Sequence, residues 1–189
     1  MRVVFLLPYR CDAGAPDRKG QLATFLATVP EMLQGARVEC RYIVCEQSAD
    51  ARRFNKGAVV NACFKTTTWD AEDLVCVHDI DLIPEADIIG EYTKALNADT
   101  VRHIGSAFKR YAGCKKYMGG ILLMRASDFA AVNGFPNDFE GWGGEDDVLG
   151  KRITHRFAVE RSRGTLVDLE RLVSPRDKLA QLIQYKSMG

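Results

Sequence analysis

Short, mainly apolar runs alternate along the chain with stretches whose apolar residues recur at helical spacing. The runs have the length of buried strands and lie at residues 3–7, 40–44, 74–77, 104–108, 121–124 and 166–169. The predicted helices carry their apolar stripes at Leu22, Phe25, Leu26, Val29 and Leu33, at Ala58, Val59, Ala62 and Cys63, at Ile88, Ile89, Tyr92 and Leu96, and at Val148, Leu149 and Ile153. This alternation predicts an α/β protein with a mainly parallel, Rossmann-like central sheet and helices on both faces.

Local signals mark where several of these elements begin and end. Pro8 is expected to stop the first strand, and Pro84 is expected to end pairing after the strand at 74–77, because proline has no N–H for a ladder. Asn55 is a predicted N-cap, and Ser127 is predicted to cap a short helix that ends at residues 133–134. A last helix is predicted from residue 174.

The bulk properties place the chain among ordinary globular proteins. With 189 residues, 47% hydrophobic and 27% charged, it suits one domain. A net charge of +1 argues against a general nucleic-acid binder, and no stretch approaches the ~20 apolar residues of a membrane span. The six cysteines form no C-x-x-C pair, which fits a reducing compartment. We therefore expect a soluble, cytoplasmic protein, unless the chain is a trimmed form of a longer one.

Two carboxylates follow the apolar run at 74–77. Asp79 and Asp81 are two residues apart, so an extended backbone presents both on one face. Clustered oxygens suit Mg²⁺ or Mn²⁺, which often binds one or two carboxylates together with substrate phosphates. The alternative is an acidic loop that only solubilises the end of a strand.

A second acidic cluster follows a loop of three glycines around Trp142. Glu145, Asp146 and Asp147 then open a predicted helix. Acidic residues in a first turn complement the helix dipole, which is the plainer explanation. An indole beside carboxylates also suits a sugar, whose hydroxyls carboxylates accept, and one carboxylate within reach can deprotonate an attacking hydroxyl.

These motifs, taken in order, resemble the β-1,4-galactosyltransferases, which are inverting enzymes with a GT-A glycosyltransferase fold. The resemblance covers most of the chain and rests on residues 7–10, 54–57 with Asn61 and Phe64, 78–84, 117–120, 133–137 and 141–147. The last of these, Gly-Trp-Gly-Gly-Glu-Asp-Asp, is the most diagnostic. The forms His-Asp-x-Asp-Leu and Gly-Gly-Ile-Leu-Leu look closest to the branch that galactosylates xylose on proteoglycan linkers.

The resemblance implies a role for each site residue. A UDP-sugar would be held by Pro8, Tyr9, Arg10, Arg18, Phe54, Lys56 and Asp79, and Mn²⁺ (or Mg²⁺) by Asp81 with Asp79 nearby. Asp146 would be the general base for a saccharide acceptor. The donor sugar and acceptor would be shaped by Tyr117, Gly120, Trp142, Gly143, Gly144, Glu145 and Asp146. Residues 1–85 would form the nucleotide-binding half and residues 86–189 the acceptor half of one catalytic domain.

One departure from the family affects the metal site. The family completes this site with a late His near a Met, but residues 165–178 contain neither, which leaves Asp168 and Glu170 as candidate replacements. Galactose is the expected sugar. UDP-glucose, UDP-xylose and UDP-N-acetylgalactosamine stay open as donors, as does a degenerate nucleotide- or glycan-binding module without turnover. The oligomeric state is not predicted.

Overall fold

The computed structural model describes residues 1–11, 17–50, 52–141 and 143–171, and residues 176, 177, 179, 180 and 183 of the C-terminal segment. Its centre is a six-stranded sheet in the order β2-β1-β3-β6-β5-β7. The strands are β1 (Arg2–Tyr9), β2 (Glu39–Glu46), β3 (Leu74–His78), β5 (Thr100–His103), β6 (Ile121–Arg125) and β7 (Ala158–Arg161). The pairs β1–β2, β1–β3 and β5–β7 are parallel, whereas β6 runs antiparallel to both neighbours. The sheet is therefore mixed but mostly parallel, which confirms the predicted fold class.

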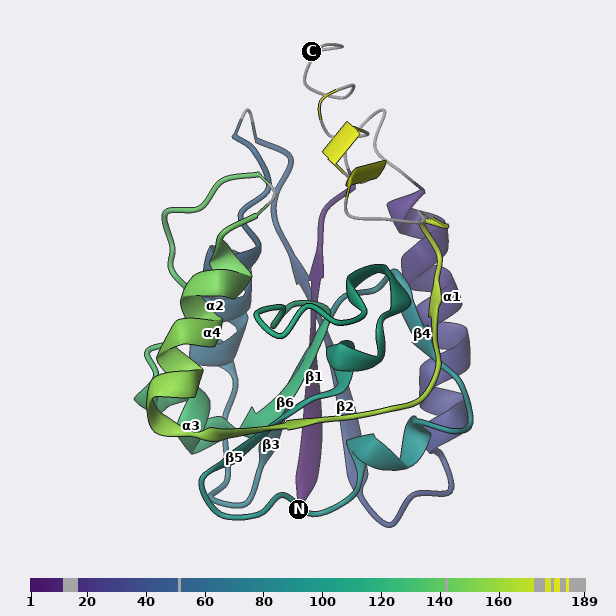
Figure 1. Ribbon diagram of the computed structural model, residues 1–189, viewed down its shortest axis with the longest axis vertical. Helices are drawn as coiled ribbons and strands as arrows, with labels where there is room; N and C mark the ends of the chain where they lie inside the picture. Colours follow the sequence, from purple (N-terminus) through teal and green to yellow (C-terminus); the bar gives the residue numbers. More distant parts are fainter. Residues whose placement is uncertain are drawn as a thin grey trace.

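Helices cover both faces of this sheet (Figure 1). They are α1 (Arg18–Leu33), α2 (Lys56–Thr66), α3 (Ala126–Ala131) and α4 (Glu145–Arg156). Side chains alternate along β1, so Phe5 and its like-facing neighbours pack with Phe25 of α1 in one core. Leu6 packs in a second core with residues of the other three helices, among them Phe129 and Leu149. Both faces of the sheet are thus buried, as parallel strands require.

The helix starts are only partly as predicted. The Asn55 side chain accepts a hydrogen bond from the Ala58 N–H at 2.8 Å, which confirms the N-cap of α2. The predicted cap at Ser127 is wrong, because β6 runs directly into α3 and Arg125 occupies the N-cap without a side-chain bond. The end of α3 is close to the prediction, since Asn133 and Gly134 have φ of 59° and 51°.

Two predicted elements in the middle of the chain are wrong. Residues 88–96 form only a short 3₁₀ turn, Ile89–Tyr92, in place of a helix. The guanidinium of Arg102 donates hydrogen bonds to the carbonyl oxygens of Glu91, Lys94 and Ala95. In a continued helix, carbonyl oxygens such as these would accept from backbone N–H groups instead. Residues 104–107 also form a 3₁₀ turn, and the strand lies just before them as β5.

The prolines and the exposed residues bring smaller corrections. Strand β1 continues through Pro8 to Tyr9, paired with β2. Its pairing with β3 ends at Leu6, so the missing N–H of Pro8 interrupts no backbone hydrogen bond to β3. Leu26 is 41% exposed, although the helical stripe of α1 places it on the buried face. Ala62 of α2 is also exposed, and Val60 is the residue of that helix that is buried in the protein core.

A second, two-stranded sheet joins distant parts of the chain. Strand β4 (Leu82–Pro84) pairs antiparallel with β8 (Leu166–Asp168). The prediction of a strand near residue 166 is confirmed, and Pro84 is the last residue of β4, opposite Leu166. Strand β7 was not predicted, because its sequence Ala-Val-Glu-Arg has no apolar run and it pairs along one edge only.

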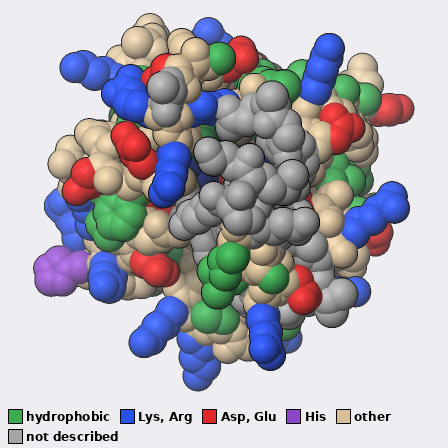
Figure 2. Space-filling view, turned by 90° about the horizontal axis from the view of Figure 1, so that it is seen from above, with side chains coloured by type: hydrophobic (Ala, Val, Ile, Leu, Met, Phe, Trp, Pro, Cys, Tyr) green, Lys and Arg blue, Asp and Glu red, His purple; other side chains and the backbone are tan. Residues whose placement is uncertain are grey.

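The carboxyl ends of β1, β2 and β3 lie together at the upper end of the molecule in Figure 1. From that end, acidic and basic side chains are interspersed over the surface that is described (Figure 2). No helix in the described part of the chain combines the length and apolarity that crossing a bilayer requires.

Candidate active site

The Asp-x-Asp segment is held between β6 and β8. The Asp79 N–H donates to the Gly120 carbonyl at 2.8 Å, and the Asp81 carbonyl accepts from the Leu169 N–H at 2.8 Å. Backbone bonds therefore fix the segment from two sides, at the carboxyl end of β3. In open α/β sheets this edge is where ligands bind.

Lys56 joins the two acidic clusters that the sequence singles out. Its Nζ lies 2.9 Å from Asp79 Oδ1 and 3.1 Å from Asp146 Oδ1. Burial opposes the ammonium charge, but the carboxylates of Asp146, Asp79 and Glu145 outweigh it and raise the pKa of Lys56. Burial raises the pKa of Asp79 despite Lys56, and the Asp146 charge adds to that rise. The carboxylates that end β3 and open α4 thus share one cation.

Glycines allow Asp146 to lie against bare backbone. A Cβ on Gly119 would come 2.5 Å from Asp146 Oδ2 and 2.9 Å from Tyr117 Cε2, so a larger residue at this position would displace these side chains. Gly144, the N-cap of α4, has φ of 94°, a conformation that side chains rarely adopt. These glycines let α4 begin beside β6.

Glu145 is buried and incompletely satisfied. The residue is 6% exposed, and its Oε2 has no hydrogen-bond partner among the described residues. Burial, and then the neighbouring Asp146 charge, raises the pKa of the Glu145 carboxyl. A buried acceptor without a donor is costly, by about 1–3 kcal/mol, unless a ligand supplies one.

Tyr117 lies beside the same cluster of carboxylates. Its ring stacks on Tyr111 with centroids 4.1 Å apart. A Cβ on Gly120 would lie 2.9 Å from the Tyr117 hydroxyl, so the phenol extends over this glycine. Burial, together with the Asp79 and Asp146 carboxylates, raises the pKa of Tyr117.

Asp81 belongs to a second ion cluster. Arg18 binds Asp81 Oδ2 and Glu170 Oε1, each at 3.2 Å, through its two terminal nitrogens. Arg110 binds Glu170 Oε2 at 3.0 Å and also contacts the carboxylate of Asp168. Burial opposes both guanidinium charges, but the acidic partners outweigh it and raise the pKa of Arg18 and of Arg110.

The remaining residues predicted for the nucleotide come from the end of β1, the position after it and the loop before α2. Pro8 and Tyr9 are buried at the end of β1. The guanidinium of Arg10 donates to the carbonyl oxygen of Asp50 at 3.1 Å, and it also bonds the carbonyl of Arg52. The Phe54 carbonyl accepts from the Gly141 N–H at 2.7 Å, which ties this loop to the glycine-rich one.

Two further predicted residues belong to the glycine-rich loop itself. Gly143 is exposed next to the start of α4. Trp142 lies outside the described residues, as do residues 172–175, where the last helix was predicted to begin.

Sequence reasoning missed Arg110, Tyr111 and Gln21. Gln21 accepts from Arg18 at 2.9 Å and is buried, although a helical pattern gives no reason to expect a polar residue there. Arg110 and Tyr111 follow Phe108 in a 3₁₀ turn and have no recognisable spacing to the acidic motifs. The only local signal was a basic and aromatic run, Phe-Lys-Arg-Tyr, before the glycine pair.

The donor set fits a hard divalent cation in its chemistry. Asp81 and Glu170 supply carboxylate oxygens that face the same guanidinium, and Mg²⁺ or Mn²⁺ takes such ligands. Within the described residues, no three or more potential ligands are gathered into a metal site. The protein would therefore supply one or two carboxylates, and a diphosphate would supply further oxygens.

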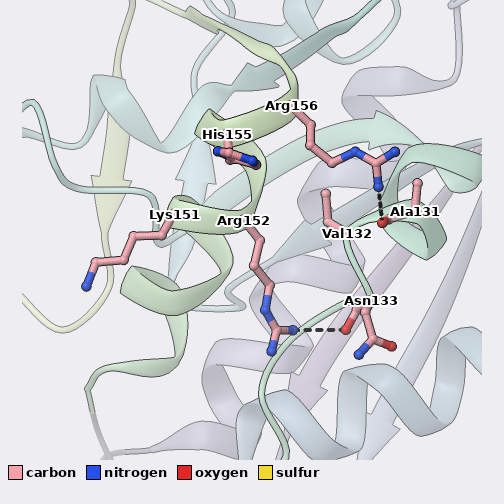
Figure 3. A pocket seen from close by; sticks show the side chains of 7 residues that line it. All are labelled: Ala131, Val132, Asn133, Lys151, Arg152, His155 and Arg156. Carbon is pink, nitrogen blue, oxygen red and sulfur yellow. Dashed lines mark hydrogen bonds between the residues drawn. The ribbon is translucent and has the colours of Figure 1, made fainter.

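A pocket of about 500 Å³ lies elsewhere, between α3 and the C-terminal half of α4 (Figure 3). Its lining is basic, but Arg152 donates to the carbonyls of Asn133 and Gly134, and Arg156 to that of Ala131. These arginines cap the end of α3, which is a structural role. The acidic residues predicted for the site are not part of this lining.

Comparison with known proteins gives matches along nearly the whole chain. Residues 1–92 match a family model described as the N-terminal region of glycosyl transferase group 7, and residues 100–176 match one described as the N-terminal domain of galactosyltransferase. β-1,4-Galactosyltransferase 6 of Rattus norvegicus is 34% identical over 170 residues. This alignment covers 87% of the chain but 42% of the relative, so the chain spans less than half the length of that protein.

Solved structures agree with this assignment. The catalytic domain of Drosophila β-1,4-galactosyltransferase 7 in complex with xylobiose has a TM-score of 0.73 and 26% identity, covering 89% of this chain and 67% of that one. A mutant form in complex with manganese, UDP-Gal and xylobiose has a TM-score of 0.72 and 26% identity, covering 89% and 68%. The matches in sequence and in structure thus converge with the ordered motifs, and the chain belongs to the β-1,4-galactosyltransferase family.

Proposed function

We propose that the chain transfers galactose from UDP-galactose to a saccharide hydroxyl with inversion at the anomeric carbon. The observation that carries this proposal is the sharing of Lys56 by Asp79 and Asp146, at 2.9 and 3.1 Å. A carboxylate near the nucleotide and a candidate base are thereby held together at the ligand-binding edge of the sheet. The structural relative in complex with manganese, UDP-Gal and xylobiose supports the choice of donor and of a sugar acceptor.

Each carboxylate then has a task. The acceptor oxygen attacks the anomeric carbon of galactose, the bond from that carbon to the diphosphate oxygen breaks, and UDP departs. Asp146 takes the proton of the attacking hydroxyl, with Lys56 holding its carboxylate in place. Glu145 offers its buried, unpartnered Oε2 to a sugar hydroxyl. Tyr117 and Gly120 form the wall beside the sugar, and Trp142, Gly143 and Gly144 belong to the loop that excludes water.

Pro8, Tyr9, Arg10, Phe54 and Arg18 would bind UDP, on the side of Asp81. A divalent cation at Asp81 would supply Lewis-acid stabilisation of the charge on the departing diphosphate. This assignment of Mn²⁺, like the division into a nucleotide half and an acceptor half, is part of the proposal.

The test is UDP release from a panel of UDP-sugars, with Mn²⁺, Mg²⁺ or EDTA and with and without simple sugar acceptors. UDP-galactose should give the highest rate, and an acceptor should increase it. Asp146→Asn should lower transfer by about 10²-fold or more while UDP binding is kept, because only the base is lost.

Asp147→Asn is the matched control, since Asp147 lies in the same first turn but is exposed. Equal losses in the two variants would contradict the role of Asp146. A faster reaction with UDP-glucose, UDP-xylose or UDP-N-acetylgalactosamine would correct the donor. UDP binding without release from any donor and acceptor would identify a binding module.

A further inference from the structure

The second ion cluster includes three carboxylates and two guanidiniums, an arrangement that the proposed function leaves unexplained. Strand β8 brings Glu170 to Asp81, because Leu82 pairs with Asp168 and the Leu169 N–H binds the Asp81 carbonyl at 2.8 Å. Two carboxylates almost half the chain apart thus lie at one place, and backbone pairing sets their separation.

The guanidinium of Arg18 bridges these two carboxylates. Arg18 reaches Asp81 Oδ2 and Glu170 Oε1 with different nitrogens of the same guanidinium, both at 3.2 Å. These distances exceed the ~2.7–2.9 Å of strong charge-assisted bonds. The Arg18 side chain is 27% exposed, whereas the Glu170 side chain is 1% exposed. Arg18 is therefore the member of the bridge that can leave, and the carboxylates are the members that stay.

Arg110 holds Glu170 from the opposite side. It binds Oε2 at 3.0 Å, its side chain is 5% exposed, and its guanidinium packs 4.8 Å from the centre of the Phe108 ring. With Oε2 fixed in this way, Oε1 is the oxygen turned toward Asp81. Metal-binding carboxylates commonly have such a supporting bond to their second oxygen.

The net charge of the two clusters opposes the binding of an anionic diphosphate. Asp81, Asp168 and Glu170 against Arg18 and Arg110 leave one net negative charge in this cluster. Asp79 and Asp146 against Lys56 leave another in the neighbouring one. A diphosphate brings further negative charge, so its binding needs a cation, and a guanidinium already consumed by carboxylates does not provide it.

Resting on the proposed function, we infer that Glu170 is the second protein ligand of the divalent cation, together with Asp81. Arg18 occupies the position between them when no donor is bound, and it moves to the diphosphate when the cation takes its place. Arg110 is a positioning residue for Glu170. Glu170 therefore does the work for which the family's motif has a late histidine, and no His or Met is needed in residues 165–178.

The experiment measures Mn²⁺ binding directly, by the loss of the free-ion electron paramagnetic resonance signal, with and without UDP. Glu170→Gln keeps the shape and removes the charge, and it should weaken Mn²⁺ binding by about tenfold or more. Glu160→Gln is the matched control, because Glu160 is also paired with a buried arginine, Arg102, outside the site. It should bind Mn²⁺ as the unaltered chain does.

Arg18→Gln gives an effect of opposite sign in two conditions. Without UDP it should tighten Mn²⁺ binding, since the competing cation is gone, and with Mn²⁺ present it should weaken UDP binding. Glu170→His should restore part of the Mn²⁺ affinity that Glu170→Gln loses. Thermal unfolding checks that each variant is folded, and Arg18→Gln tests the bridge even if a change at the buried Glu170 prevents folding.

The inference would be overturned by unchanged Mn²⁺ affinity in Glu170→Gln, or by weaker Mn²⁺ binding by Arg18→Gln without UDP. Transfer at full rate in EDTA would also overturn it, while leaving the proposed transferase intact. Absence of transfer with every donor, but with Mn²⁺ binding that depends on Glu170, would instead remove the proposed function and keep the metal site.

Discussion

Arg102 and Arg18 both bind carboxylates, but they differ in exposure and in the kind of partner. Arg102 is 1% exposed and donates to three backbone carbonyls, of Glu91, Lys94 and Ala95, as well as to Glu160. Arg18 binds only side chains among its described hydrogen-bond partners, and two of these are carboxylates that suit another cation. Backbone partners make an ion pair part of the fold, whereas side-chain partners leave it exchangeable.

The largest expected effect breaks the fixed cluster. Arg102→Met should lower the free energy of unfolding by about 3–5 kcal/mol, because it leaves carbonyl groups and Glu160 without their buried cation. Chemical denaturation measures this loss. UDP affinity per folded molecule should stay as it was. A stability change below about 1 kcal/mol would mean that the carbonyls find water, and that this cluster is less fixed than the distances imply.

The exchangeable cluster should respond in the opposite way. Asp81→Ala should remove the increase in UDP affinity that Mn²⁺ gives, since one of two carboxylate ligands is lost. Stability should fall by about 1 kcal/mol or less, as is usual for partly exposed ion pairs. Titration calorimetry with UDP, in Mn²⁺ and in EDTA, measures the first effect and denaturation the second.

Asp70→Ala is the control for Asp81→Ala, because the Asp70 side chain is 80% exposed and pairs with Arg2 outside the site. If Asp81→Ala and the unaltered chain show the same UDP affinity in both buffers, Asp81 does not bind the cation.

Buried histidines extend the comparison to pH. Burial lowers the pKa of His78 to about 3 and that of His103 to about 4. In the unfolded chain both would titrate near 6.5, so between these values the unfolded state binds more protons and stability falls as the pH falls. Each group should contribute a slope of up to about 1.4 kcal/mol per pH unit, below pH 6.5.

Denaturation curves at pH 7, 6 and 5 measure this slope, with His103→Gln as the variant and His155→Gln as the exposed control. His103→Gln should flatten the dependence and His155→Gln should not. An unchanged slope in His103→Gln would assign the pH dependence to other groups.

The smallest expected effect concerns a helix cap close to the site, which stabilises the fold. Asn55 caps α2 through the Ala58 N–H and donates to the Asn137 carbonyl at 2.6 Å. Asn55→Ala should therefore lower the free energy of unfolding by about 1 kcal/mol. Asn97→Ala, at an exposed position, is the control in the same denaturation experiment. A change in UDP affinity per folded molecule would show that the cap also positions Lys56.

The sequence predicted the elements that fill the core, and the reason is visible in the structure. Runs such as residues 74–77 contain only apolar residues, which are buried in the structure, so their pattern identifies β3 directly. The prediction failed where one long side chain decides the backbone, as Arg102 does for residues 88–96. It also failed at β7, whose half-buried residues follow no clear period.

The candidate site shows the same division. Its carboxylates stand in short motifs, so Asp79, Asp81, Glu145 and Asp146 were identified from spacing and resemblance. Of their cationic partners, Lys56 and Arg18 were predicted from the resemblance, whereas Arg110 lies at a distant position without a recognisable motif. The sharing of Lys56 by both acidic clusters, and the clamp of Arg110 on Glu170, depend on how β6, β8 and α4 pack together.

The ladder between β4 and β8 has a consequence for how the protein is made. Strand β4 leaves the ribosome more than 80 residues before its only partner in the two-stranded sheet, β8. The core around β1 and β3 can form first, because its contacts are closer in sequence. The end of the site that holds Asp81 matures last, when Leu169 and Glu170 arrive. A nascent chain can therefore form most of its core before the segment that holds Asp81 is complete.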